Sequence, residues 1–163
     1  MISRENIHSS ILELLKMNLG HKFSEYQIPP PVFVTMEGMF LEFDQELKSI
    51  KTRFPVLEKY TNPYGFLQGG IITALIDNTI GPLSILIAPP NLTRSLEIKF
   101  SSPITLGTKY ITVFAKFIDR SGSKIRFNAV VRDPNDKKIA SAKATHWIIK
   151  NDELQGNEHQ KPC

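Results

Sequence analysis

The sequence predicts an α+β fold in which one curved antiparallel sheet wraps around a central buried helix. Two observations carry this prediction. Residues 68–80 are apolar on every side, which is the pattern of a helix buried all round rather than one on a surface. Residues 34–54 and the region after residue 95 contain short segments typical of strands, two before the helix and four after it. A sheet curled around one helix satisfies both patterns.

The first part of the chain, residues 1–33, is expected to hold a helix and a proline-rich linker. Residues 4–19 form an amphipathic pattern, with Ser3 as the cap and Gly20 as the stop. Its apolar stripe consists of Ile7, Ile11, Leu14, Leu15 and Leu19. The segment at 28–33, "IPPPVF", is predicted to be extended and not helical.

The next part, residues 34–150, is expected to form the sheet and the central helix. "MFLEF" and "LKSIKTRF" read as strands joined near Asp44 and Gln45. The helix runs from about Gln68 to Ile80 or beyond, and Gly81 and Pro82 are predicted to end or kink it. Four strands follow, at 96–100, 109–119, 124–132 and 138–150. The polar tail, 151–163, is expected to be disordered.

Composition favours a single cytoplasmic domain. The chain has 163 residues, 41% of them hydrophobic, which is enough for one core. Cys163 is the only cysteine, so we expect no disulfide framework and a reducing, cytoplasmic setting. No secretory signal is recognisable, and Asp77, Gly81 and Pro82 argue against a membrane span in the long apolar stretch.

Several function classes find little support. The net charge is only +4 and the basic residues are scattered, so nucleic-acid binding is not expected. The four histidines have neither HxxxH nor HExxH spacing, which predicts no metal site and leaves each as a surface or strand histidine. No dinucleotide or phosphate-binding glycine motif occurs, and no cofactor is expected. The histidines are His8, His21, His146 and His159.

Asp77 is the only charged side chain between Lys59 and Arg94. An isolated buried carboxylate costs several kcal/mol unless it is paired, hydrogen-bonded or protonated, so its presence here indicates function. Two alternatives are open. Asp77 could point to solvent, or it could cap a helix that begins at Asn78.

Gln68, Gly69 and Gly70 stand where the helix is predicted to start. The first N–H groups of a helix have no partner within it, and they can stabilise an oxyanion. Glycines let a substrate carbonyl approach the backbone, although they could equally be a flexible helix start or a packing contact. Asp77 lies nine residues after Gln68, about 13 Å along the helix and about half a turn away. If both serve one reaction, they come from different protomers of a homodimer, which could pair further into a tetramer.

The stretch "NPYGFLQGGIITALIDN" resembles the signature of the phenylacetate-pathway (PaaI-like) hotdog acyl-CoA thioesterases. That signature has an Asn, a His six residues later followed by Gly-Gly, and an Asp nine residues after the His. Asn62, Gln68, Gly69, Gly70 and Asp77 fall at these spacings. The similarity continues in "TRSLEIKFSSPITLG" and covers about residues 34–149. The matching positions in that second stretch are Thr93, Pro103 and Gly107.

The resemblance implies hydrolysis of an acyl-CoA thioester at a site shared by two protomers. In this picture Asp77 is the general base or the nucleophile, and Thr93 helps to place the water. The Gly69 N–H would stabilise the oxyanion, while Asn62 and Gln68 would orient the carbonyl. Further substrate contacts are expected from Gly70, Asn78 and Arg94.

Gln68 departs from the pattern, because the family has His at this position. Glutamine can donate a hydrogen bond but cannot titrate, so positioning is retained and acid catalysis is lost. A non-catalytic acyl-CoA-binding protein is therefore the alternative. A dehydratase would need a histidine in the site, and residues 60–93 contain none. The acyl chain, the leaving group and the contacts to the CoA phosphates are left open, with four candidates for the last: Arg94, Lys99, Arg120 and Lys124.

Overall fold

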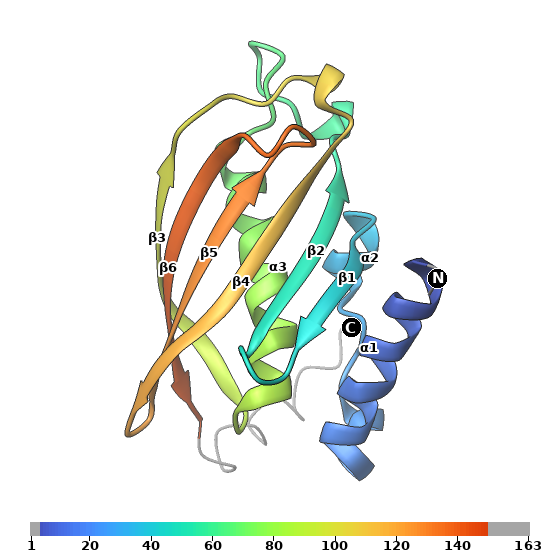
Figure 1. The fold of residues 1–163 in the computed structure, drawn as a ribbon, viewed down its shortest axis with the longest axis vertical. Helices are drawn as coiled ribbons and strands as arrows, with labels where there is room; N and C mark the ends of the chain where they lie inside the picture. The colour runs from blue at the N-terminus through green and yellow to red at the C-terminus, as the bar shows by residue number, and fades with distance from the viewer. Residues whose placement is uncertain (1–3, 150–163) are drawn as a thin grey trace, which may run out of the picture.

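A computed structural model describes residues 4–149 and has a six-stranded antiparallel sheet that curves around a long helix, α3 (Figure 1). The strands lie in the order β1-β2-β4-β5-β6-β3, so the strand that follows the central helix in sequence becomes one edge. The strands are β1 (Met39–Asp44), β2 (Ser49–Pro55), β3 (Asn91–Phe100), β4 (Tyr110–Ser121), β5 (Lys124–Arg132) and β6 (Lys138–Ile148). The α-helices are α1 (Arg4–Leu19), α2 (Pro31–Thr35) and α3 (Gly69–Ile87). This is the predicted arrangement.

The core lies between α3 and the inner face of the sheet. Ile76, Ile80 and Leu83 of α3 are fully buried, as are the inward-facing residues of β2, β4 and β5. One polar contact crosses this core, since the hydroxyls of Thr52 on β2 and Thr79 on α3 lie 2.6 Å apart. By length and composition α3 could cross a membrane, but here it is the core helix of the sheet. Its remaining face is only half-buried in the single chain.

The central helix extends beyond Ile80 and does not end at Gly81 and Pro82, where the sequence predicted an end or a kink. It continues through Gly81 and Pro82 and ends at Ile87, although a proline inside a helix costs about 3 kcal/mol. Burial of Pro82 and of the residues after it offsets this cost. The Ser84 hydroxyl donates to the carbonyl oxygen of Gly81 at 2.7 Å within this last part of the helix.

The N-terminal helix covers the β1 side of the sheet and contacts α3 (Figure 1). Its bounds match the predicted range, and Ile11 and Leu15 are buried as the stripe predicts. Leu14 was expected in that stripe but is 38% exposed, because it lies on the flank of the packed face. The Asn18 side chain donates to the carbonyl oxygen of Leu86 at 2.8 Å and ties the end of α1 to the end of α3. The predicted cap, Ser3, and the tail at 151–163 lie outside the described residues.

The proline-rich segment was predicted to be extended, but part of it forms α2, Pro31–Thr35. Pro31 occupies the first helical turn, where a missing N–H breaks no helical hydrogen bond. The helix forms because it buries Phe33, whose ring stacks on Phe40 and meets Phe54 edge-on.

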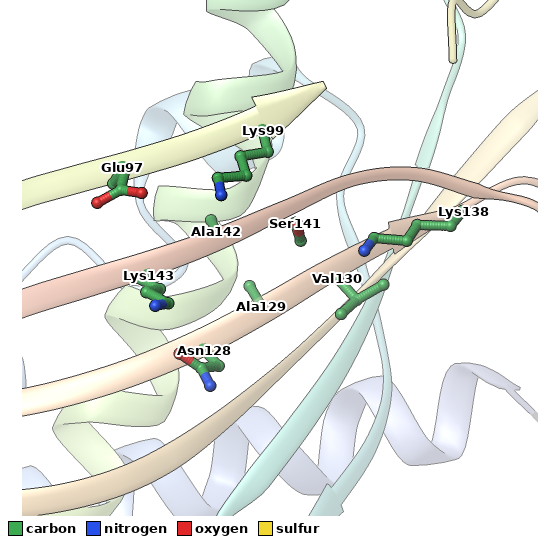
Figure 2. Close-up of a pocket in the computed structure, with 9 residues that line it drawn as sticks. All are labelled: Glu97, Lys99, Asn128, Ala129, Val130, Lys138, Ser141, Ala142 and Lys143. Carbon is green, nitrogen blue, oxygen red and sulfur yellow. The ribbon is translucent and has the colours of Figure 1, made fainter. Parts of the chain in front are cut away.

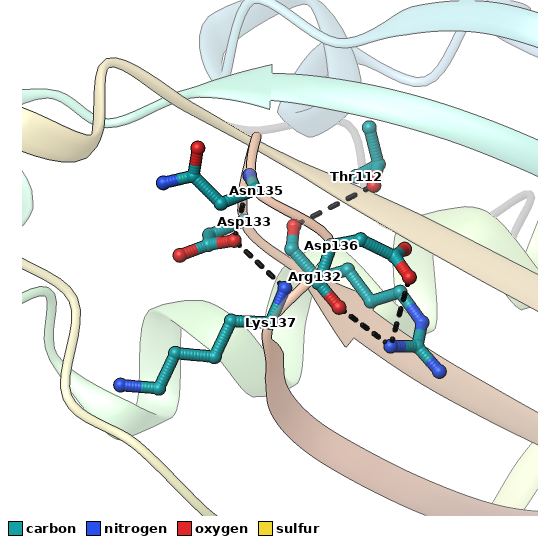
Figure 3. A network of polar contacts seen from close by, with 6 residues as sticks. All are labelled: Thr112, Arg132, Asp133, Asn135, Asp136 and Lys137. Atoms are coloured by element: carbon teal, nitrogen blue, oxygen red, sulfur yellow. Dashed lines mark hydrogen bonds and ion pairs between the residues drawn. The ribbon is translucent and has the colours of Figure 1, made fainter.

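The β5–β6 hairpin closes at the predicted polar turn, 133–137, and Figure 3 shows its contacts. The Asp133 carboxylate accepts hydrogen bonds from the backbone N–H groups of Asn135 and Lys137, both at 2.9 Å. Asp136 adopts a φ of 66°, and the guanidinium of Arg132 donates to its carbonyl oxygen. This rigid turn holds β5 and β6 in register.

Candidate active site

The start of α3 lies where the sequence predicts it. Gln68 is the N-cap residue, its backbone is extended and its exposed side chain makes no cap hydrogen bond. The N–H groups of Gly69 and Gly70 open the helix. Neither has a hydrogen-bond partner within the part of the chain that the structure describes. Two backbone donors and the positive end of the helix dipole are therefore free to bind an anion or a carbonyl oxygen.

A cleft of about 350 Å³ opens at this helix end, and Asn62, Gly69 and Phe100 line it. The ring of Phe100, at the end of β3, lies so close that a Cβ on Gly69 would be 3.2 Å from its Cζ. The absence of a side chain on Gly69 thus keeps both the ring and the cleft in place. Phe100 is 55% exposed, as an apolar cleft wall would be.

Asn62 is the first residue of the matched stretch and shapes the loop before the helix. Its side-chain oxygen accepts hydrogen bonds from the backbone N–H groups of Tyr64 at 2.9 Å and Phe66 at 3.1 Å. Because the oxygen serves the loop, the amide NH₂ is the part of this side chain left for a ligand in the cleft. The structure thereby brings Asn62 and Gly69 together.

Asp77 lies on α3 beyond the first two turns, next to the edge strand β3. It is half-buried in the single chain, and its Oδ1 accepts a hydrogen bond from the Thr93 hydroxyl at 2.8 Å. Asp77 and Thr93, two of the predicted site residues, are therefore in direct contact. The alternative that Asp77 caps a helix starting at Asn78 is wrong, because the helix already begins at Gly69.

A histidine that the sequence analysis set aside lies directly behind this pair. The Nε2 atom of His146, on β6, is 3.2 Å from the Thr93 hydroxyl oxygen, and its Nδ1 is 2.7 Å from Oδ1 of Asn91. Burial lowers the pKa of His146 below its ordinary value, while the nearby Asp77 carboxylate raises it by a smaller amount. The signal that identifies this residue is strand register, since β3 pairs with β6 and Thr93 lies opposite His146.

The three expected substrate contacts lie in different surroundings. Gly70 is exposed, and a side chain there would meet no atom within 4 Å. The Asn78 amide donates to the carbonyl oxygen of Ala74 at 2.9 Å, so its hydrogen-bonding capacity is partly used within the helix. The guanidinium of Arg94 lies 5.6 Å from the Trp147 ring centroid, next to Thr93 in sequence.

The candidate site residues therefore lie in two groups at different places on one helix, and we call these groups half-sites. The first half-site is Asn62, Gly69 and Phe100 at the start of α3; the second is Asp77, Thr93 and His146 at its side. Gly69 and Asp77 are eight residues apart, which is about 12 Å of helix rise. A single reacting carbonyl cannot touch both within one chain.

Lysines gather at a different hollow, on the outer face of the sheet (Figure 2). Lys99, Lys138 and Lys143 line it, together with the small side chain of Ser141. Lys99, one of the candidates for the CoA phosphates, thus faces away from α3. Among the described residues no group of three or more His, Cys, Asp or Glu side chains is placed to hold a metal ion.

Solved structures share this architecture. A phenylacetic acid degradation-related protein of Ralstonia eutropha JMP134, described as a candidate thioesterase, has a TM-score of 0.71 and 22% identity, over 83% of this chain and 98% of that one. The PaaI protein of the Escherichia coli phenylacetic acid degradation operon has a TM-score of 0.70 and 13% identity, over 86% and 96%. A Streptococcus mutans protein bound to acetyl-CoA has a TM-score of 0.63 and 20% identity, over 68% and 86%.

At the level of sequence, no model of a known protein family matches the chain, and no curated protein matches it. The similarity therefore lies in three-dimensional arrangement, and it establishes that the chain has the hotdog fold of the PaaI-type structures.

Proposed function

We propose that this protein hydrolyses acyl-CoA thioesters. The observation that carries the proposal is the hydrogen bond from Thr93 to Asp77, on a helix whose first N–H groups are free. A carboxylate and an oxyanion-binding helix end are the two groups that hydrolysis of a thioester needs. Proteins of the same fold support the substrate class, because one is bound to acetyl-CoA and a Streptococcus pneumoniae protein carries coenzyme A.

Asp77 acts as the general base in this proposal. Thr93 occupies its Oδ1, and Oδ2 has no partner among the described residues, so a water molecule can bind there. Asp77 takes a proton from this water as the water oxygen attacks the carbonyl carbon. When the tetrahedral intermediate collapses, the C–S bond breaks and Asp77 returns the proton to the leaving thiolate. The products are the free acid and the thiol.

The oxyanion is stabilised by the Gly69 N–H of the other protomer. Because the two half-sites lie about 12 Å apart on one helix, a two-fold axis must bring the helix start of one chain beside Asp77 of its partner. The half-buried face of α3 and the exposed edge strand β3 are the surfaces such a homodimer would cover. Asn62 and Gln68 then donate amide hydrogen bonds to the thioester carbonyl.

The test measures free-thiol release from short-chain, long-chain and aromatic acyl-CoAs. We expect Asp77→Asn, which retains the shape of the side chain, to lose about 10²–10⁴-fold in kcat, as removal of a general base does. Glu42→Gln is the matched control, because it neutralises an exposed carboxylate on β1, at the opposite edge of the sheet, and should leave kcat unchanged.

Binding of acyl-CoA without hydrolysis would contradict the proposed function. If the wild-type protein binds acyl-CoA in a saturable manner but releases no thiol from any substrate, the protein is a binding module. The exposed Gln68 in the position of a histidine is the observation that would then explain the missing turnover.

A further inference from the structure

His146 is the one buried residue with a titratable side chain in the described part of the chain. It is 2% exposed, and its ring meets Phe127 edge-on at 5.0 Å between centroids. The hydrolysis proposed above assigns it no role. Its two ring nitrogens nevertheless join it through Thr93 to the carboxylate of Asp77.

The hydrogen-bond partners of the His146 ring determine which of its two nitrogens must carry a hydrogen. The Asn91 amide nitrogen donates to the carbonyl oxygen of Pro89 at 2.8 Å, so the side-chain oxygen of Asn91 faces Nδ1 as an acceptor. Nδ1 must therefore carry a hydrogen. Thr93 gives its single hydroxyl hydrogen to Asp77, so its oxygen offers only lone pairs to Nε2. A hydrogen bond between Thr93 and His146 then requires a hydrogen on Nε2 as well.

All of these contacts are satisfied together only when the imidazole is doubly protonated, and burial opposes that state. Asp77 on α3 is the charged group whose field reaches the ring, and none of the residues that pair with or stack on it titrates. These neighbours are Asn91 and Thr93 on β3 and Ile125 and Phe127 on β5. In the neutral ring Nε2 is an acceptor, and it competes with Asp77 for the one hydroxyl hydrogen of Thr93.

We propose that His146 is a positioning residue that decides, through the Thr93 hydroxyl, whether Asp77 receives a hydrogen bond. This inference rests on the proposed hydrolysis. When His146 takes up a proton, Nε2 donates to Thr93 and the hydroxyl is fixed on Asp77, which makes the carboxylate a weaker base. When His146 is neutral, the hydroxyl is shared and Asp77 accepts a proton from water more readily. His146 itself exchanges no proton with the substrate.

The first experiment compares the pH dependence of kcat/KM in the wild type and in His146→Phe, with exposed His21→Phe as the control. We expect the wild type and the control to lose activity on the acid side in a step that His146→Phe lacks. At neutral pH we expect His146→Phe to be about tenfold less active, since its Thr93 always donates to Asp77. A wild-type acid limb in His146→Phe overturns the proposal.

The second experiment separates positioning from a merely structural role. If His146 acts through the Thr93 hydroxyl, His146→Phe should change kcat/KM by less than twofold when Thr93→Val is already present. Equal losses in both backgrounds would mean that His146 only supports the fold. Because phenylalanine could disturb packing, His146→Gln is measured in parallel, and its activity should likewise lack the acid step.

The third measurement needs no activity. Nitrogen chemical shifts of the His146 ring, followed against pH, report its protonation directly. Asp77→Asn should lower the midpoint, because it removes the negative charge that favours the imidazolium. An unchanged midpoint contradicts the network itself. If the wild type hydrolyses no thioester but the midpoint moves, the contact exists, and the proposed function and the positioning role of His146 both fail.

Discussion

The two half-sites on α3 differ in the chemical groups that form them. The half-site at the start of the helix uses backbone N–H groups of Gly69 and Gly70, a loop held by Asn62 and an open cleft beside Phe100. The half-site at Asp77 uses side chains only, and they come from three elements: α3, β3 and β6. The glycines of the first half-site can be tested by adding a side chain, whereas the second half-site is tested by changing the polar groups of its side chains. Each therefore calls for a different kind of variant.

Mixing variants of the two half-sites gives the largest expected effect. Asp77→Asn and Gly69→Val should each be nearly inactive alone, since each homodimer lacks one component at both sites. If the halves come from different protomers, a heterodimer of the two variants has one intact site. With random pairing, co-expression should restore about a quarter of wild-type activity, because half the dimers are mixed and each has one working site.

Co-expression of the two variants can also contradict a site shared between protomers. If co-expressed variants form heterodimers, verified with two different affinity tags, and still release no thiol, then the two half-sites do not serve one reaction. Co-expression of Asp77→Asn with untagged Asp77→Asn is the control for background hydrolysis.

The two glycines offer a matched pair within the first half-site. Gly69→Ala places a Cβ 3.2 Å from the Phe100 ring, which must shift into the cleft, whereas Gly70→Ala meets no atom within 4 Å. We expect Gly69→Ala to lower kcat/KM by about 10–100-fold through displacement of the substrate. Gly70→Ala keeps the backbone N–H and should lower kcat/KM much less, while it raises the free energy of unfolding by about 0.5–1 kcal/mol. Equal activity of the two variants would show that contact with Phe100 does not shape the cleft.

The difference between the two half-sites also explains which of their residues could be predicted from the sequence. In the first half-site, Gly69 and the start of the helix could be identified from the residues themselves, Asn62 came from the resemblance to the thioesterases, and Phe100 was not predicted as a site residue. In the second half-site, Asp77 could be identified as the only charge in an apolar run, whereas Thr93 came from the resemblance to the thioesterases. His146 was set aside because its position beside Thr93 depends on β3 pairing with β6. The order of strands in a sheet cannot be predicted from a local sequence pattern.

The structure departs from the local rules for proline in two places, and in both places burial in the core outweighs the rule. Proline normally ends a helix, yet α3 passes Pro82 because the residues beyond it are buried. The proline-rich segment forms α2 because Phe33 enters the core. The local sequence pattern around these prolines carries no information on which side chains pack against them.

Asn62 tests whether the first half-site depends on its loop. Asn62→Ala removes the acceptor of two backbone hydrogen bonds, so we expect it to lower the free energy of unfolding by about 1–2 kcal/mol. Asn62→Asp keeps the acceptor and should lose much less stability. Urea unfolding of both variants measures the difference. If the two are equally destabilised, the acceptor does not hold the loop.

The smallest expected effect concerns stability against pH in the second half-site. The pKa of His146 lies below 6.5 in the folded protein, so between that value and 6.5 the unfolded chain binds more protons. Stability from this group is complete above about pH 6.5 and is lost as pH falls toward the folded value. Melting temperature should therefore drop on acidification in the wild type and drop less in His146→Phe. Replacing the exposed His21 by phenylalanine should leave the wild-type slope intact. If His146→Phe shows that same slope, carboxylates elsewhere account for the acid sensitivity. Burial of the imidazole would then not limit stability in this range.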